Sequence, residues 1–203
     1  MKPDFDVLVI GGGAAGLTAA GMSAVLGAKT ALVEARTLGG DCTWHGCVPS
    51  KSLLRAAKIA HQMRTAGRFG LTPANVEHDF SRVLDRVHSI QERIYADADA
   101  PPKFEKLGVE VIPGSARFIG PHAVEIEANG TARRLTSRYF VVATGSSPSR
   151  PRLETDGSVP VLTNETIFDL DRLPKRLLVL GTRALSESRW HKLSNAWAPR
   201  SPW

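Results

Sequence analysis

The sequence contains only two cysteines in 203 residues, and it lacks an apolar run long enough to cross a lipid bilayer. Two cysteines are too few for the disulfide scaffold of a small secreted protein, so a close pair favours redox or metal chemistry. The N-terminus lacks the apolar core and the small-residue cleavage site of a signal peptide. We therefore expect a cytoplasmic protein with no membrane partner and with a core drawn from its 42% of apolar residues.

The net charge of +6 is not gathered into a basic patch that would favour nucleic acid. Half of it comes from residues 182–203, which hold four basic residues against one acidic residue. The other basic residues are scattered and do not alternate with aromatic residues. We therefore expect a solvated surface and no nucleic-acid partner.

The first 34 residues have the pattern of a βαβ unit. The apolar run at residues 5–10 ends at glycines and predicts a buried parallel strand. Residues 14–26 are rich in alanine and leucine and predict a helix, and residues 29–34 predict a second strand that ends in Glu34. Three further helices are expected, at residues 49–66, at residues 80–95 and, after Pro101-Pro102, up to Leu107.

From Val109 the apolar period changes to two, which predicts strands. We expect four of them to form a small antiparallel meander, at residues 109–112, 116–119, 123–127 and 132–135, with Asn129-Gly130 as a hairpin turn. Residues 139–143 predict another buried strand. The expected fold class is therefore α/β, a Rossmann-like domain with a parallel sheet, helices and a small meander.

The turn Gly11-x-Gly13-x-x-Gly16 follows the first predicted strand and opens the first predicted helix. Its glycines allow, in order, a tight turn, close approach of a pyrophosphate and close packing of helix on strand. The helix N-terminus offers N–H groups to phosphates. Glu34 follows Gly16 by 18 residues and can accept hydrogen bonds from a ribose diol. The segment predicts a dinucleotide site and leaves the choice between FAD and NAD open.

Both cysteines lie in the segment Gly39–Lys51, which reads Gly-Gly-Asp-Cys-Thr-Trp-His-Gly-Cys-Val-Pro-Ser-Lys. A regular helix would not quite bring the sulfurs of Cys42 and Cys47 together, whereas a distorted first turn can bring the Cα atoms within about 7 Å. A nearby helix N-terminus and lysine lower the pKa of a thiol. Three interpretations stay open: a redox disulfide, a zinc site that includes His45, and two structural cysteines. Zinc needs a fourth ligand, and the flanking motif favours redox chemistry.

These motifs, with Val141–Ser146, resemble those of the pyridine nucleotide-disulfide oxidoreductases, a family that includes dihydrolipoyl dehydrogenase, glutathione reductase and mercuric reductase. The resemblance covers roughly residues 4–181, and the Asp-Cys-Thr-Trp variant is most similar to mercuric reductase-like members. It implies that NAD(P)H reduces FAD and that FAD reduces a Cys42–Cys47 disulfide. That pair would then reduce a small molecule, a disulfide or a metal ion.

The resemblance also implies residue roles. Cys42 would attack the substrate, Cys47 would lie against the flavin as its charge-transfer partner, and Lys51 would stabilise the reduced flavin near N5. Glu34 would hold the adenosine ribose, and Ala116 would approach FAD through its backbone. The implied FAD-binding set is Gly11, Gly13, Ala15, Gly16, Glu34, Gly40, Asp41, Cys42, Lys51, Ala116, Thr144, Gly145 and Ser146, and no residue is expected to bind a resident metal.

The sequence departs from the family pattern after residues 177–181, which resemble the first strand of an NAD(P)-binding domain. Arg183 and Ser186 stand near positions where the family has glycines, and an arginine cannot occupy a place where backbone touches pyrophosphate. Three of the four tryptophans then follow within the last 14 residues. We hypothesise a reading-frame change near Gly181–Thr182, with a genuine divergent tail as the alternative.

The expected domain organisation has three parts. Residues 1–150 form an FAD-binding domain, residues 151–181 form the crossover and first strand of a truncated NAD(P)-binding domain, and residues 182–203 form an aberrant, disordered tail. The NAD(P) site and the dimerisation domain of the homodimeric family would be missing. The chain is therefore expected to be an impaired oxidoreductase fragment, with a non-enzymatic flavin-binding fragment or pseudogene product, and then a zinc-binding module, as alternatives.

Overall fold

The structure is a computed structural model that describes residues 2–74, 79–150, 153–154 and 157–180. The chain divides into two compact units. The first unit comprises Met1–Thr43 and Arg93–Ser147, and the second comprises Trp44–Glu92 and the described residues from Pro148 onward. The chain thus passes from one unit to the other three times within the expected domain 1–150, after Thr43, after Glu92 and after Ser147.

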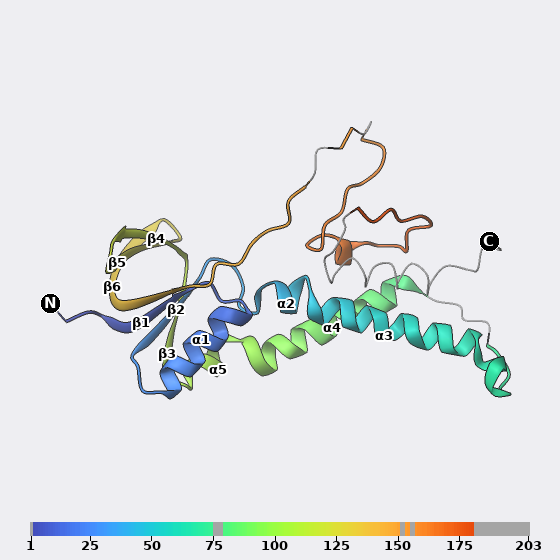
Figure 1. Ribbon diagram of the computed structural model, residues 1–203, viewed down its shortest axis with the longest axis horizontal. Helices are drawn as coiled ribbons and strands as arrows, with labels where there is room; N and C mark the ends of the chain where they lie inside the picture. The colour runs from blue at the N-terminus through green and yellow to red at the C-terminus, as the bar shows by residue number, and fades with distance from the viewer. Residues whose placement is uncertain (1, 75–78, 151–152, 155–156, 181–203) are drawn as a thin grey trace. The chain divides into compact units, whose positions relative to one another are not determined.

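The first unit contains a six-stranded sheet with the strand order β3-β2-β1-β6-β5-β4 (Figure 1). β1 pairs in parallel with both β2 and β6, and β2 pairs in parallel with β3. The other two pairings, β4 with β5 and β5 with β6, are antiparallel. The strands span Phe5–Ile10 (β1), Thr30–Glu34 (β2), Val109–Pro113 (β3), Ser115–Gly120 (β4), Ala123–Ala128 (β5) and Thr131–Val142 (β6). The expected α/β, Rossmann-like fold with a small meander is confirmed.

The expected place of the strand at residues 109–112 was wrong, because β3 lies parallel to β2 instead of joining the meander. The helix α5 (Pro101–Glu105) precedes β3 and belongs to the long crossover that parallel pairing requires. Gly114 then connects β3 to β4 with a φ of 145°, and a Cβ there would come within 2.7 Å of the Ile126 side chain. The meander therefore begins one strand later than the alternation alone predicts.

The two strands expected at residues 132–135 and 139–143 are one strand, β6, and this expectation was also wrong. The first half of β6 pairs with β5, and its second half pairs with β1, so a single strand belongs to both parts of the sheet. Ser137 lies between the halves, is fully buried and donates from its hydroxyl to the carbonyl of Tyr139 at 2.8 Å. A polar residue that interrupts the apolar pattern therefore does not interrupt the strand, because its hydroxyl has a partner.

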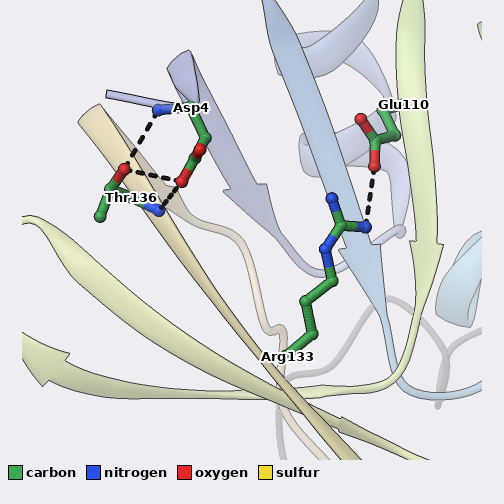
Figure 2. A network of polar contacts seen from close by, with 4 residues as sticks. All are labelled: Asp4, Glu110, Arg133 and Thr136. Atoms are coloured by element: carbon green, nitrogen blue, oxygen red, sulfur yellow. Dashed lines mark hydrogen bonds and ion pairs between the residues drawn. The ribbon is translucent and has the colours of Figure 1, made fainter. Parts of the chain in front are cut away.

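Asp4, which precedes β1, forms hydrogen bonds with Thr136 of β6 (Figure 2). Oδ2 of Asp4 accepts from the backbone N–H of Thr136 at 2.8 Å and from its hydroxyl at 2.7 Å. The backbone N–H of Asp4 donates back to that hydroxyl at 3.1 Å. Figure 2 also shows the ion pair of Arg133 with Glu110, at 3.0 Å, which joins β6 to β3.

Apolar side chains cover both faces of the parallel part of the sheet, as buried parallel strands require. Successive strand residues point to opposite faces. Leu8 and Ile10 pack with meander residues such as Val124, whereas Val9 packs with α1 and α5 through Leu17 and Phe104. The helix α1 spans Ala14–Val25, close to the predicted bounds.

The second unit is built on two long helices, α3 (Cys47–Arg64) and α4 (Phe80–Ile94), and the last two residues of α4 are assigned to the first unit. Short 3-10 helices, η1 (Ala66–Phe69) and η3 (Ile167–Asp169), complete it. Its apolar core brings α3, α4 and η3 together, with Leu53, Val87 and Phe168 among the buried members. The helix predicted at residues 49–66 begins two residues earlier, so that Cys47 is its first residue.

The strand expected at residues 177–181 does not form over its described part, Leu177–Leu180. A strand needs a neighbouring strand to satisfy its backbone groups, and Leu178 is 81% exposed. Gly181 and the tail 182–203 lie outside the described residues, as does the place of the hypothesised frame change. Within the described part of the chain, no helix combines the length and the apolar character that crossing a membrane requires.

Candidate active site

The glycine turn lies at the carboxyl ends of β1, β2 and β6. Gly11 donates its N–H to the carbonyl of Val33 at 2.8 Å, and Ala143 donates to the carbonyl of Ile10 at 2.8 Å. Gly11 has a φ of 106°, and a Cβ there would collide with the carbonyl of Ala143. The turn therefore packs closely against the neighbouring strand ends, and only glycine fits at its first position.

The third glycine of the motif is required for packing within the same turn. A Cβ on Gly16 would collide with the carbonyl oxygen of Gly11. Helix α1 can therefore begin this close to the strand only with glycine at this position. The first and third glycines have the steric roles that the motif predicts.

The second glycine, Gly13, has an unexpected neighbour. Gly40 has a φ of 56°, and a Cβ on it would come within 2.7 Å of the Cα of Gly13. The N–H of Gly39 donates to the carbonyl of Gly12 at 2.9 Å. The backbone of the Gly39-Gly40 segment thus lies directly on the dinucleotide turn. Sequence reasoning placed Gly40 in the site but missed this contact, whose only signal was the pair of adjacent glycines.

Glu34 ends β2 and holds the turn with both carboxylate oxygens. Oε2 accepts from the N–H of Gly12 at 2.5 Å, and Oε1 accepts from the N–H of Arg36 at 2.7 Å. A carboxylate has about four acceptor positions. Two backbone bonds therefore leave capacity for the hydroxyls of a ribose.

The start of α1 fits a pyrophosphate. Its N-cap, Gly13, supplies no side chain, and the next two residues are the exposed alanines Ala14 and Ala15. The first N–H groups of a helix have no partner within the helix, and the helix dipole adds positive potential there. Small residues at this end leave room for phosphate oxygens to reach those groups. Together with the Glu34 carboxylate, the residues present therefore fit a dinucleotide such as FAD.

The predicted cofactor residues after β6 reach the same turn. Thr144 follows that strand, and its Cα would lie 3.0 Å from a Cβ on Gly11. Gly145 has a φ of 67°, and the side chains of Thr144 and Ser146 are exposed. Ala116 lies in β4 opposite Ile126, so its place is in the meander.

The two cysteines lie on separate helices instead of sharing one. Cys42 lies in α2 (Gly40–Trp44), and Cys47 is the first residue of α3. Both are half-buried thiols in this structure. The helix break at His45-Gly46 replaces the single distorted helix that sequence reasoning considered. No cluster of three or more ligand side chains suited to a metal occurs among the described residues, so the zinc interpretation gains no support.

Each of the two residues after Cys42 is held by a partner far away in the sequence. Thr43 is 3% exposed and donates its hydroxyl to Oδ2 of Asp99 at 2.6 Å, within the first unit. The carbonyl of Trp44 accepts from Nε2 of the buried Gln91 at 2.8 Å, within the second unit. Sequence reasoning missed both partners, because neither belongs to a motif.

The remaining predicted residues are accessible. Asp41 is exposed in the first turn of α2. Lys51 is exposed on α3, four residues after Cys47, so the two lie one turn apart on the same side of that helix. Cys47 and Lys51 belong to the second unit.

Fold and motifs define a protein of the α/β class with a Rossmann-like glycine turn, and comparison with known proteins gives its family. The chain belongs to the pyridine nucleotide-disulphide oxidoreductase family, whose profile matches residues 5–182. The resemblance drawn from the motifs is therefore confirmed. The match ends where the composition of the chain changes.

Three curated relatives illustrate the range of the family. The chain is 35% identical to dihydrolipoyl dehydrogenase of Bacillus subtilis, 34% to mercuric reductase of Lysinibacillus sphaericus and 30% to glutathione reductase of Burkholderia cepacia. Each alignment covers 89% of this chain, but only 40%, 32% and 38% of the respective relative. The chain thus spans about a third to two fifths of the length of these relatives.

Proposed function

We propose that this chain forms the FAD-binding and redox-cysteine part of an oxidoreductase that passes electrons from NAD(P)H to a substrate through a Cys42–Cys47 disulfide. The main support is the backbone contact between Gly13 and Gly40, which joins the dinucleotide turn to the helix that carries Cys42. When bound, the flavin supplies two-electron transfer between a nicotinamide and the disulfide. The substrate class is a small molecule, a disulfide or a metal ion, and the whole protein acts as a homodimer.

The residues of the turn bind and orient the cofactor in this proposal. N–H groups at the start of α1, next to Gly13 and Ala15, receive the pyrophosphate, and the Glu34 carboxylate accepts from the adenosine ribose. The residues after β6, Thr144 to Ser146, and the backbone of Ala116 complete the binding set together with Gly11, Gly16, Gly40 and Asp41. Lys51 supplies positive charge beside the redox pair.

The cysteines perform thiol–disulfide exchange. In the reduced pair, the Cys42 thiolate attacks the substrate. With a disulfide substrate, one sulfur becomes bonded to Cys42 and the other leaves as a thiol. Cys47 then attacks Cys42, which releases the second product thiol and closes the Cys42–Cys47 disulfide.

A single substitution separates cofactor binding from folding. Among the described residues, a Cβ on Gly13 would meet only the Cα of Gly40, at 3.8 Å, and Gly13 has a φ of −80° that alanine adopts freely. We expect Gly13→Ala to lower the stability of the chain by less than about 1 kcal/mol, as a poorer N-cap. It should weaken FAD binding by about tenfold or more, because the methyl group occupies the approach of the pyrophosphate.

The measurement is FAD titration of the purified 203-residue chain by flavin fluorescence, with thermal unfolding alongside. Gly21→Ala is the matched control, because it adds the same methyl group to the same helix against Leu107 and Phe104 at an ordinary 3.7 Å. Equal FAD affinity for Gly13→Ala and the original chain would contradict the proposed binding mode. Absence of FAD binding by the original chain would contradict the proposed function itself.

A second candidate is flavin binding without turnover. Arg183 and Ser186, in place of glycines near the start of the expected NAD(P) domain, favour it. Reduction of the FAD-loaded chain with NADH or NADPH, compared with reduction by dithionite, distinguishes the two. If only dithionite reduces the cysteines, the result supports the second candidate. If NADH or NADPH also reduces them, the result supports the first.

A further inference from the structure

The contact between Asp99 and Thr43 joins the redox segment to a part of the chain that carries no motif. The two residues are 56 positions apart, both belong to the first unit, and their hydrogen bond is short at 2.6 Å. A bond from a hydroxyl to a carboxylate is charge-assisted and stronger than one between neutral groups. Thr43 follows Cys42 directly, so the bond acts on the backbone that carries the cysteine.

The same carboxylate also touches the residue that precedes α2. A Cβ on Gly39 would lie 2.9 Å from Oδ2 of Asp99 and 2.9 Å from Cβ of Thr43. Gly39 has a φ of 101°, a left-handed conformation that favours glycine. Asp99 therefore lies against both ends of the five-residue stretch Gly39–Thr43, which contains Cys42, and there is no room for a side chain at position 39.

The Asp99 carboxylate belongs to an uncommon type of helix. Residues Tyr95–Asp99 form a π-helix, η2, directly after α4. Its widened turn is closed by the N–H of Ala100, which donates to the carbonyl of Tyr95 at 2.8 Å. Ala100 precedes Pro101 and is extended, as the residue before a proline prefers. A π-helical turn adds a residue to the helix and shifts the direction of the side chains after it, and such turns are common at functional sites.

We infer that Asp99 is a positioning residue for Cys42. Its carboxylate anchors α2 through Thr43 and so keeps Cys42 ordered for ring closure with Cys47. The inference rests on the proposed function, since it assumes that the two cysteines form the redox pair. Without the anchor, disulfide formation would have to restrict the motion of the Cys42 backbone. The anchor already restricts that motion in the dithiol, so ring closure loses less conformational entropy and the disulfide form is favoured.

The test is the equilibrium of the 203-residue chain with glutathione disulfide. Two chain thiols and one glutathione disulfide give one Cys42–Cys47 disulfide and two glutathione thiols. The glutathione S–S bond breaks, the chain S–S bond forms, and both thiol protons end on glutathione. Acid quenching, alkylation and mass spectrometry give the equilibrium constant for each variant.

We expect Asp99→Ala and Thr43→Val each to lower this equilibrium constant roughly tenfold, the ratio that corresponds to the ordering of about one residue. The double variant should lose no more than either single variant, because both remove the same bond. Thr43→Ser keeps the hydroxyl and should stay within about twofold of the original chain. Asp97→Ala is the matched control, because Asp97 is an exposed carboxylate on the same π-helix.

The outcomes distinguish a failure of the inference about Asp99 from a failure of the proposed function. If the original chain forms the disulfide and Asp99→Ala forms it equally well, the inference is overturned and the proposed function stands. If the original chain forms no intramolecular disulfide, both are overturned. A loss in Thr43→Ser equal to that in Thr43→Val also overturns the inference, since the hydroxyl would then not matter.

Discussion

At the scale of single residues, the glycines of the dinucleotide turn differ in what they do. Gly11 and Gly16 are fixed by backbone packing within the turn, whereas Gly13 has an open side that Gly40 alone approaches within the described part of the chain. The motif pattern identifies all three but cannot tell these roles apart. The neighbours of each missing Cβ do, because they separate glycines needed for folding from a glycine available for binding.

We expect Gly16→Ala to destabilise the first unit strongly, by about 3 kcal/mol or more, because the added methyl group collides with the rigid carbonyl of Gly11. Chemical denaturation of the chain measures the loss. Gly21→Ala, on the same helix, should instead stabilise by about 0.5–1 kcal/mol, as alanine replaces glycine in a helix interior. Equal stabilities for the two variants would contradict the packing seen at Gly16.

At the scale of elements, β6 decides the architecture of the first unit, because it pairs with the meander on one half and with β1 on the other. Asp4 fastens the start of β1 at the junction of these halves. Hydrogen bonds from the Thr136 hydroxyl and then from its N–H hold the pKa of the Asp4 carboxyl below its ordinary value of 3.8. This contact therefore makes the junction sensitive to acid.

A folded-state pKa below the unfolded value means that the contribution of Asp4 is complete above about pH 4–5. This stabilisation is lost as the pH falls from 3.8 through the lowered pKa of Asp4 in the folded state, where the carboxyl becomes protonated. We expect Asp4→Asn to be less stable than the original chain at pH 7, and the difference to disappear in acid. Denaturation of both chains from pH 7 down to a pH below the lowered pKa measures this, and a difference that persists there would rule out the carboxylate as its source.

At the scale of the whole molecule, each unit gathers segments that are distant in the sequence. The second unit joins helices from residues 47–92 to the short helix η3 near residue 168. Phe168 is 3% exposed in this core. The segment that the sequence assigns to a crossover thus forms part of a hydrophobic core.

We expect Phe168→Ala to cost about 3–5 kcal/mol of stability, the range for removing a buried aromatic ring. Leu178→Ala is the control, because Leu178 is 81% exposed and should change stability by less than about 0.5 kcal/mol. Thermal and denaturant unfolding of the two variants provides the comparison. Similar small losses in both would mean that η3 does not belong to the core.

The sequence by itself determined the elements whose pattern is local and the family to which they belong. Residues 5–34 predict a strand, a glycine turn, a helix and a strand, because apolar period and glycine spacing act within a few residues. The helices near residues 49–66 and 80–95 are amphipathic and were found within two residues of their predicted ends. The motif around Cys42 and Cys47 indicated redox chemistry for the same reason, since its residues are contiguous.

Only the tertiary structure decided which distant segments meet. The direction of β3 and the continuity of β6 depend on their partner strands, and a strand's own alternation carries no information about its partner. The contacts of Gly13 with Gly40 and of Thr43 with Asp99 depend on how turns and helix ends pack. Residues outside a motif can thus position the residues of that motif, because hydrogen bonds and close packing connect residues that are near in space but distant along the chain.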